Sequence, residues 1–222
     1  MATWQERDLA HIWHPCSQMK DYEDFPPIII ERGEGVRLFD LDGKDYIDII
    51  SSWWCNTLGH CNPDIAEAVA QQAKKLDHVL FANFSHEGII QLAEELAAIM
   101  PEGLDKLCFS DNGSTSVECA LKMSFQYHLQ TGHPEKQRFM CLSEGYHGET
   151  LGALSVCADA TYAGMYAPLM HRSHVIEAPD CYRCAYGCTR DACSCPCFEH
   201  AERQFEQHGR ETCAVIVEPL LQ

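Results

Sequence analysis

The chain has 222 residues, of which 46% are hydrophobic, so it is long enough to bury at least one sizeable core. Its 16 Lys and Arg residues stand against 33 Asp and Glu residues, and the formal net charge of -17 disfavours nucleic acid and anionic lipid as partners. The start of the chain has no basic or apolar leader segment, and no apolar run approaches about 18 residues, which predicts a cytoplasmic protein without a membrane span.

Residues 1–60 are predicted to be a segment of a small domain that contains antiparallel strands. Short apolar runs within residues 28–51 are interrupted by the turn sequences at 33–35 and at Asp42-Gly43. This pattern favours a small antiparallel sheet with a hairpin turn at Asp42-Gly43.

The sequence SSWW follows that sheet and contains two adjacent tryptophans, Trp53 and Trp54. In extended backbone, neighbouring side chains point to opposite sides, so at least one indole would be poorly buried unless something covers it. A ligand pocket and plain packing at a domain interface both remain open as the cover.

Residues 61–222 are predicted to form a larger, incomplete domain of the α/β class. Helices are expected after the cap sequence Asn62-Pro63 and from Ser85. Further along, apolar runs alternate with helical patterns: strands at 106–111, 138–143, 173–180 and 213–219, and helices at 114–130, 149–156 and 198–209. This alternation predicts a mainly parallel sheet with helices on both faces and ligands at the carboxyl ends of the strands. Because the last strand has no following helix to cover it, we expect the domain to be truncated.

The sequence FSDNGSTSVECALKM, residues 109–123, contains a strand end, a turn at Asn112-Gly113 and a helix that begins at Ser114 or Thr115. Free N–H groups and the positive end of the helix dipole would form a cradle for an anion, and Gly113 allows close approach of its backbone. The pattern therefore indicates a phosphate-bearing ligand. A simple turn and cap is the alternative.

The sequence EGYHGET, residues 144–150, follows the next predicted strand. Because neighbouring parallel strands end at the same edge of a sheet, Tyr146 and His147 are expected near the phosphate cradle, where the Tyr146 ring could stack on a planar heterocycle. A phosphate together with a flat ring indicates pyridoxal phosphate. An ordinary half-buried tyrosine is the alternative.

From about His11 to Gln222 the chain resembles the class III aminotransferases of fold type I. The resemblance rests on five segments in this order: HIWHPCSQMKDYE, DIISSWWCNTLGH, FSDNGSTSVECALKM, EGYHGETLGALSV and AVIVEPLLQ. It implies a pyridoxal 5'-phosphate cofactor and a homodimer. The IWHP and SSWW segments are similar to the branch of the family that serves biotin biosynthesis, which implies transfer of an amino group from S-adenosylmethionine to 8-amino-7-oxononanoate.

The resemblance also implies roles for individual residues. The cofactor would be bound by Gly113, Ser114, Tyr146, His147 and Glu218. The substrates would contact Trp53, Trp54, Tyr146 and Cys16. The family's Schiff-base lysine lies downstream of the VEP strand, so no catalytic residue is expected in this chain, and the chain alone is expected to be inactive.

Cys16 departs from the family pattern, because many members have a tyrosine after His14-Pro15. The change removes an aromatic wall and a hydroxyl from the donor side of the pocket, so lysine stays open as an alternative amino donor. A class III aminotransferase that acts on an ω-amino acid or a diamine also stays open.

The loop at residues 181–197 holds six of the chain's 14 cysteines. A thiolate metal site is feasible there, with Cys181, Cys184, Cys195 and Cys197 as candidate ligands, although the spacing is irregular. A structural loop away from the cofactor and a non-catalytic metal-binding module are the two interpretations. The cysteines outside the loop are expected to fill the core: Cys55, Cys61, Cys108, Cys119, Cys141, Cys157 and Cys213.

Overall fold

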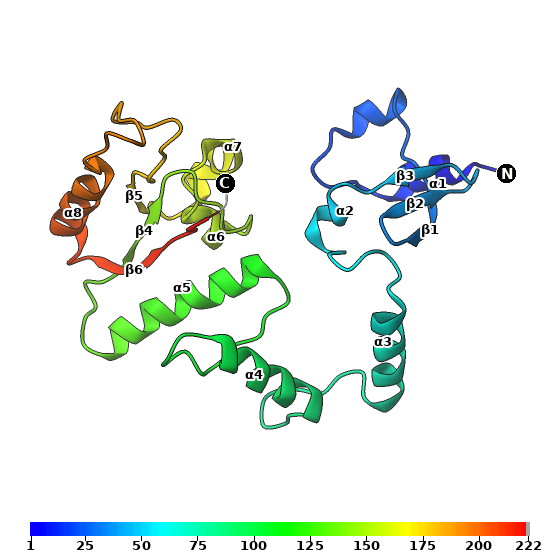
Figure 1. Ribbon diagram of the computed structural model, residues 1–222, viewed down its shortest axis with the longest axis horizontal. Coiled ribbons are helices and arrows are strands. Elements are labelled where there is room, and N and C mark those ends of the chain that lie inside the picture. The colour runs from blue at the N-terminus through cyan, green and yellow to red at the C-terminus, as the bar shows by residue number, and fades with distance from the viewer. Residues whose placement is uncertain (221–222) are drawn as a thin grey trace. The chain divides into compact units, whose positions relative to one another are not determined.

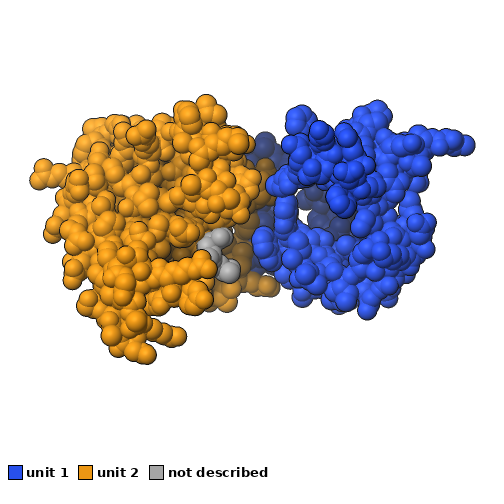
Figure 2. Space-filling model, turned by 90° about the horizontal axis from the view of Figure 1, so that it is seen from above, with its two compact units in different colours: residues 1–92 blue, residues 93–222 orange. Residues whose placement is uncertain are grey.

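The computed structural model describes residues 1–220, and the chain divides into two compact units. The first unit is Met1–Leu92 and the second is Ala93–Gln222, described as far as Leu220. Figure 1 traces the chain and Figure 2 colours the two units.

The first unit contains a small antiparallel sheet of strand order β1-β2-β3. Its elements are α1 (Trp4–His11), the 3-10 helix η1 (Met19–Glu23), β1 (Ile30–Glu34), β2 (Arg37–Asp40), β3 (Asp45–Ile47), α2 (Ser51–Trp54), α3 (Pro63–Lys75) and α4 (Glu87–Ile99), which continues into the second unit. Leu38 of β2 pairs with Tyr46 of β3, and Gly43 takes a φ of 79° in the turn between them. The predicted hairpin at Asp42-Gly43 is confirmed.

The SSWW segment forms a left-handed turn, α2, in which four successive residues have positive φ: Ser51 (49°), Ser52 (49°), Trp53 (59°) and Trp54 (63°). The prediction of extended backbone here is wrong. Asp48 explains part of the difference, because its carboxylate accepts hydrogen bonds from the Ser52 N–H (3.0 Å) and the Ser52 hydroxyl (2.7 Å). His60 Nε2 also bonds to Asp48 (2.8 Å), so this carboxylate ties the turn to the following loop.

The helix α3 begins where the sequence predicts it. Asn62 caps the helix by accepting hydrogen bonds from the N–H groups of Asp64 and Ile65, and Pro63 is the first helical residue. The next helix, α4, begins at Glu87, two residues after the predicted start at Ser85.

The second unit contains a parallel sheet of strand order β5-β4-β6. Its elements are α5 (Gly113–Gln130), β4 (Arg138–Leu142), α6 (Leu151–Ser155), α7 (Ala160–Ala163), the 3-10 helix η2 (Gly164–Leu169), β5 (His174–Ile176), α8 (Pro196–His208) and β6 (Thr212–Ile216). The helix α5 packs against β6 and α8 packs against β5. The predicted parallel sheet is confirmed.

The segment 106–111 was expected to be a strand but is irregular. A strand requires a partner for its backbone N–H and C=O groups, and no strand of residues 1–220 pairs with this segment. No helix of the described part of the chain is long and apolar enough to cross a membrane.

The core of the molecule lies around the central strand β4. Met140 and Cys141 of β4 are fully buried, as is Val156 after α6. By contrast, residues 1–92 contain no buried residue at all. The expectation that scattered cysteines fill the core is confirmed for Cys141, Cys157 and Cys213. It is wrong for Cys55, Cys61 and Cys108, which are exposed because their segments have no apolar layer over them.

Candidate active site

The first component of the site is the N-terminus of α5. Asn112 caps this helix: its side chain accepts from the Thr115 N–H (3.0 Å), and the Thr115 hydroxyl accepts from the Asn112 N–H (3.1 Å). The helix therefore begins at Gly113, earlier than predicted, because Asn112 serves as the cap and not as a turn residue. Among the described residues, the N–H groups of Gly113 and Ser114 have no hydrogen-bond acceptor. A Cβ at Gly113 would meet no atom within 4 Å, so the cradle is open.

The loop after β4 lies directly against this cradle. The Glu149 N–H donates to Ser114 Oγ (3.2 Å). Gly148 has a φ of 118°, and a Cβ there would lie 2.2 Å from Ser114 Oγ, so only glycine allows this approach. The loop and the helix start thus form one surface.

Tyr146 is held at both ends by carboxylates. Its N–H donates to Glu218 Oε2 (2.9 Å), and its hydroxyl donates to Glu149 Oε1 (3.0 Å). Burial, with further contributions from Glu149, raises the pKa of Tyr146 to about 12, so the phenol is protonated at neutral pH. Its ring also lies 5.2 Å from that of Tyr162.

His147 lies beside Tyr146 and is half-buried. Its backbone N–H donates to Cys157 Sγ (3.1 Å). Its buried ring atom Nε2 has no hydrogen-bond partner among the described residues. Burial lowers the pKa of His147, and the nearby Glu218 carboxylate opposes that shift. A buried ring nitrogen without a partner is costly, so His147 Nε2 could accept a polar group of a ligand.

Comparisons with known proteins decide the family. The family model for class III aminotransferases matches residues 18–222. The chain belongs to the class III aminotransferases.

Relatives within this family share its sequence over nearly the whole chain. The chain is 41% identical over 221 residues to the adenosylmethionine-8-amino-7-oxononanoate aminotransferase of Geobacter sulfurreducens, covering 99% of this chain and 49% of the relative. The protein of the same name from Methanocaldococcus jannaschii is 38% identical and covers 95% of this chain and 47% of the relative. The chain thus spans about half the length of the curated relatives it matches.

Solved structures agree with the family. The crystal structure of the Methanocaldococcus jannaschii enzyme has a TM-score of 0.83 at 35% identity, covering 95% of this chain and 45% of that one. An omega transaminase from Pseudomonas jessenii, solved in complex with PMP, has a TM-score of 0.90 at 28% identity, covering 100% of this chain and 49% of that one. The predicted fold and the resemblance to class III aminotransferases are confirmed.

Three of the four predicted substrate residues of this class III chain, Trp53, Trp54 and Cys16, lie in its first unit, and the fourth, Tyr146, lies in the second. Trp53 and Trp54 are exposed on the left-handed turn, and Cys16 is exposed with a φ of 54°. Their roles in substrate binding stay predictions. By contrast, three predicted cofactor residues of the second unit, Ser114, Tyr146 and Glu218, are linked to one another directly or through Glu149 by the hydrogen bonds described above.

Two acidic residues that position the site were missed by the sequence reasoning. Glu149 links Tyr146 to Ser114, and Glu118 accepts a hydrogen bond from the Gly152 N–H (2.8 Å). A signal was available for Glu118, because it follows Ser114 by four residues and therefore shares its helix face. Glu149 had no comparable signal.

The cysteine loop lines a cavity of about 100 Å³, and its first residues, Cys181 to Arg183, also line a cavity of about 720 Å³ together with Gly145 and Glu218. All six of its cysteines contribute to the wall of the smaller cavity: Cys181, Cys184, Cys188, Cys193, Cys195 and Cys197. However, no three of these thiols belong to a group of ligand atoms within 4.8 Å of one another in the described chain. Metal binding by this loop stays a prediction.

Proposed function

We propose that the chain is part of a pyridoxal 5'-phosphate-dependent aminotransferase that transfers an amino group from S-adenosylmethionine to 8-amino-7-oxononanoate in biotin biosynthesis. The observation that carries this proposal is the name shared by relatives that are 38–41% identical over at least 95% of the chain. The site in the second unit supports it through its residue chemistry.

The open start of α5 fits the cofactor phosphate. The N–H groups of Gly113 and Ser114 have no acceptor among residues 1–220, and they stand at the positive end of an 18-residue helix. Ser114 Oγ accepts from Glu149, so its own proton is free to be donated to a phosphate oxygen.

The residues after β4 fit the planar ring. Tyr146 offers an aromatic face held in place by Glu149 and Glu218, and His147 offers its unpartnered Nε2 atom to a polar substituent. When bound, pyridoxal phosphate supplies an electron sink that lets an amino group be exchanged. The residues of this chain bind and orient that group.

The proposed substrate contacts are Tyr146 of the second unit and three residues of the first unit. Trp53 and Trp54 offer exposed indoles for an apolar substrate chain, and Cys16 leaves room on the donor side. We further propose that a second copy of the protein covers the exposed apolar side chains of the first unit, giving a cytoplasmic homodimer. The lysine that binds the cofactor covalently would lie in a further part of the same protein, which corresponds to the half of the relatives that this chain does not span.

Cofactor binding tests the site. Ser114→Ala removes a hydroxyl aimed at a charged phosphate, so the dissociation constant for pyridoxal phosphate is expected to rise about tenfold or more. Ser124→Ala on the same helix is the matched control, because among residues 1–220 the Ser124 hydroxyl bonds only to the Ala120 carbonyl. Absorbance titration measures both. Equal affinity in the two variants contradicts the assigned cradle.

A substrate assay of the complete protein tests the reaction. We expect amination of 8-amino-7-oxononanoate with S-adenosylmethionine as donor. The TM-score of 0.90 to an omega transaminase favours an ω-amino acid as the second candidate. Turnover with an ω-amino acid as amino donor and a 2-oxo acid as acceptor, and none with S-adenosylmethionine and 8-amino-7-oxononanoate, would replace the first proposal with the second. The isolated 222-residue chain is expected to give no turnover.

Donor choice is tested at Cys16. Cys16→Tyr restores the residue of many family members and is expected to lower the KM for S-adenosylmethionine relative to lysine. Unchanged donor kinetics would remove position 16 from the donor site.

A further inference from the structure

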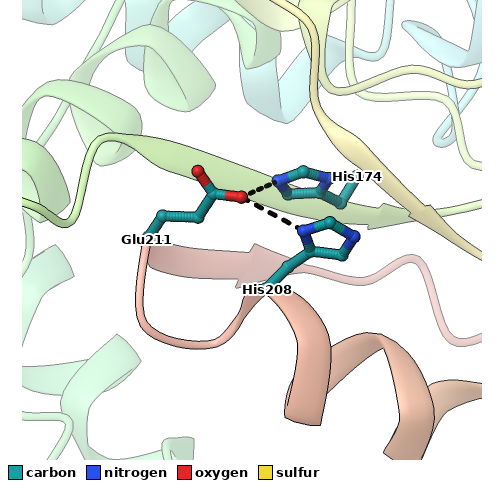
Figure 3. Close-up of side chains that lie close together, drawn as sticks. All are labelled: His174, His208 and Glu211. Carbon is teal, nitrogen blue, oxygen red and sulfur yellow. Dashed lines mark hydrogen bonds and ion pairs between the residues drawn. The ribbon is translucent and has the colours of Figure 1, made fainter.

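A second cluster of reactive side chains lies at the opposite edge of the parallel sheet from the candidate active site. His174 is the first residue of β5, His208 is the last residue of α8, and Glu211 directly precedes β6 (Figure 3). Because the strands are parallel, these residues occupy the amino-terminal edge, whereas Tyr146 and Glu218 follow the carboxyl ends of β4 and β6.

The three side chains converge on one atom. Glu211 Oε1 accepts a hydrogen bond from His174 Nε2 (3.0 Å) and another from His208 Nδ1 (3.1 Å), as the dashed lines in Figure 3 mark. One ligand atom from each residue lies within 4.8 Å of the other two. Among the described residues this is the one such group of metal-ligating side chains.

We propose that His174, His208 and Glu211 form a binding site for a divalent transition-metal ion, with zinc as the best match. Two imidazoles and one carboxylate, with a water in the fourth position, are a ligand set that zinc uses in proteins. A tetrahedral zinc ion separates its nitrogen and oxygen ligands by about 3.3 Å. The observed separations of 3.0 and 3.1 Å need to widen by only a few tenths of an ångström.

The backbone around the cluster is already fixed. The Glu211 carbonyl accepts hydrogen bonds from the N–H groups of Gln137 and Arg138, and the Glu211 N–H donates to the His208 carbonyl (3.1 Å). Lys136 Nζ donates to the carbonyls of Gly209 and Thr212. The ligands therefore need side-chain rotation and no movement of the strands.

One imidazole has to turn before an ion can bind. The rings of His174 and His208 are stacked, with centroids 3.7 Å apart and planes 15° from parallel, whereas a metal ion binds in the plane of each ring. Rotation about the Cβ–Cγ bond of a histidine is soft. The side chains of His174 and His208 are 23% and 22% exposed, which leaves room for this turn.

Two neighbouring arginines are expected to limit the affinity of the site for a metal ion. An open cleft of about 510 Å³ lies beside the cluster and is lined by His174 and Glu211 together with Arg138 and Arg172. The two guanidinium groups repel a dication, while the cleft gives water access to the open position. A site that binds zinc and stabilises the junction of α8, β5 and β6 is the expected result.

Cobalt and zinc titrations of the purified protein test the site. Cobalt is expected to bind at one equivalent with the visible d–d bands of nitrogen and oxygen ligands and without thiolate charge-transfer bands, which would mark the cysteine loop. His208→Gln and Glu211→Gln should each weaken binding about tenfold or more. His133→Gln is the matched control, because the exposed His133–Glu135 pair (3.3 Å) has only one imidazole.

Thermal unfolding gives a second readout. Zinc is expected to raise the Tm of the wild type and of His133→Gln, but not of Glu211→Gln, whose substitution lies in a turn and keeps the side-chain volume. The proposal is overturned if the wild type binds no zinc, if the Glu211 and His208 variants bind as the wild type does, or if bound cobalt shows only thiolate bands. Pyridoxal phosphate binding at the other edge should not change in any of these variants.

Discussion

The two units of this chain are stabilised in different ways. In the second unit, β4 carries fully buried side chains such as Met140, and helices cover the sheet. In the first unit no residue is buried, and large side chains such as Trp54 are 76% exposed. The first unit is instead organised by caps and polar contacts, such as Asn62 at α3 and Asp48 at α2. Local hydrogen bonds can therefore define helices and turns in a unit whose apolar side chains are not buried.

Matched truncations in the two units give the largest expected difference. Met140→Ala should cost about 2–5 kcal/mol of unfolding free energy, because it empties a fully buried position. In the 222-residue chain studied as a monomer, Ile65→Ala on α3, where Ile65 is 48% exposed, should change stability by no more than about 0.5 kcal/mol. Urea unfolding followed by circular dichroism measures both. A comparable loss at Ile65 would mean that a partner surface covers the first unit.

Cysteine labelling should also differ between the two units. Cys16, Cys55 and Cys61 of the first unit are exposed, whereas Cys141 is buried and its pKa is raised to about 11 by that burial. At pH 8 we expect alkylation of Cys141 to be about a hundredfold slower, because the thiolate is the reactive form. Mass spectrometry of partly alkylated protein gives the rates. Equal rates would contradict the described core.

Backbone strain in the first unit can be relieved by glycine. Ser51 has a φ of 49°, and its side chain makes no hydrogen bond among the described residues, so Ser51→Gly should stabilise the turn by about 1 kcal/mol. Ser85→Gly, at a position without positive φ, is the control and should not stabilise. Tryptophan fluorescence reports on this unit alone, because Trp4, Trp13, Trp53 and Trp54 all lie within it. Destabilisation by Ser51→Gly would show that the left-handed turn is not strained.

Acid should loosen the SSWW turn. Hydrogen bonds from the Ser52 N–H and hydroxyl, and then from His60, lower the pKa of Asp48 to about 2. A lowered carboxyl pKa stabilises the folded state above the ordinary value near 4, and this contribution is lost as the pH falls toward 2. Tryptophan fluorescence should therefore change between about pH 4 and pH 2 in the wild type. The change should be absent in Asp48→Asn and retained in Asp24→Asn.

Local signals made part of the structure predictable. Asn62 and Pro63 lie within a few residues of the groups they organise, so the start of α3 follows from the sequence. The meeting of Tyr146 with Glu218 also follows, because β4 and β6 are parallel and end at a common edge.

Other features depend on contacts that a linear pattern does not contain. The segment 106–111 has the composition of a strand but lacks a pairing partner, and the SSWW turn has no glycine to indicate positive φ. His174 and Glu211 are 37 residues apart, and only the order of β5, β4 and β6 brings them together. Sequence patterns therefore identified the edge of the sheet where Tyr146 and Glu218 meet and missed the histidine cluster at its other edge.

The contact of Gly148 with Ser114 has a consequence for protein engineering. A methyl group at position 148 would lie 2.2 Å from Ser114 Oγ, and the φ of 118° excludes other side chains as well. A designer who wishes to change the loop that carries Tyr146 therefore cannot exchange Gly148 without also changing the start of α5. The loop and the first turn of α5 have to be grafted as a single piece into any new scaffold.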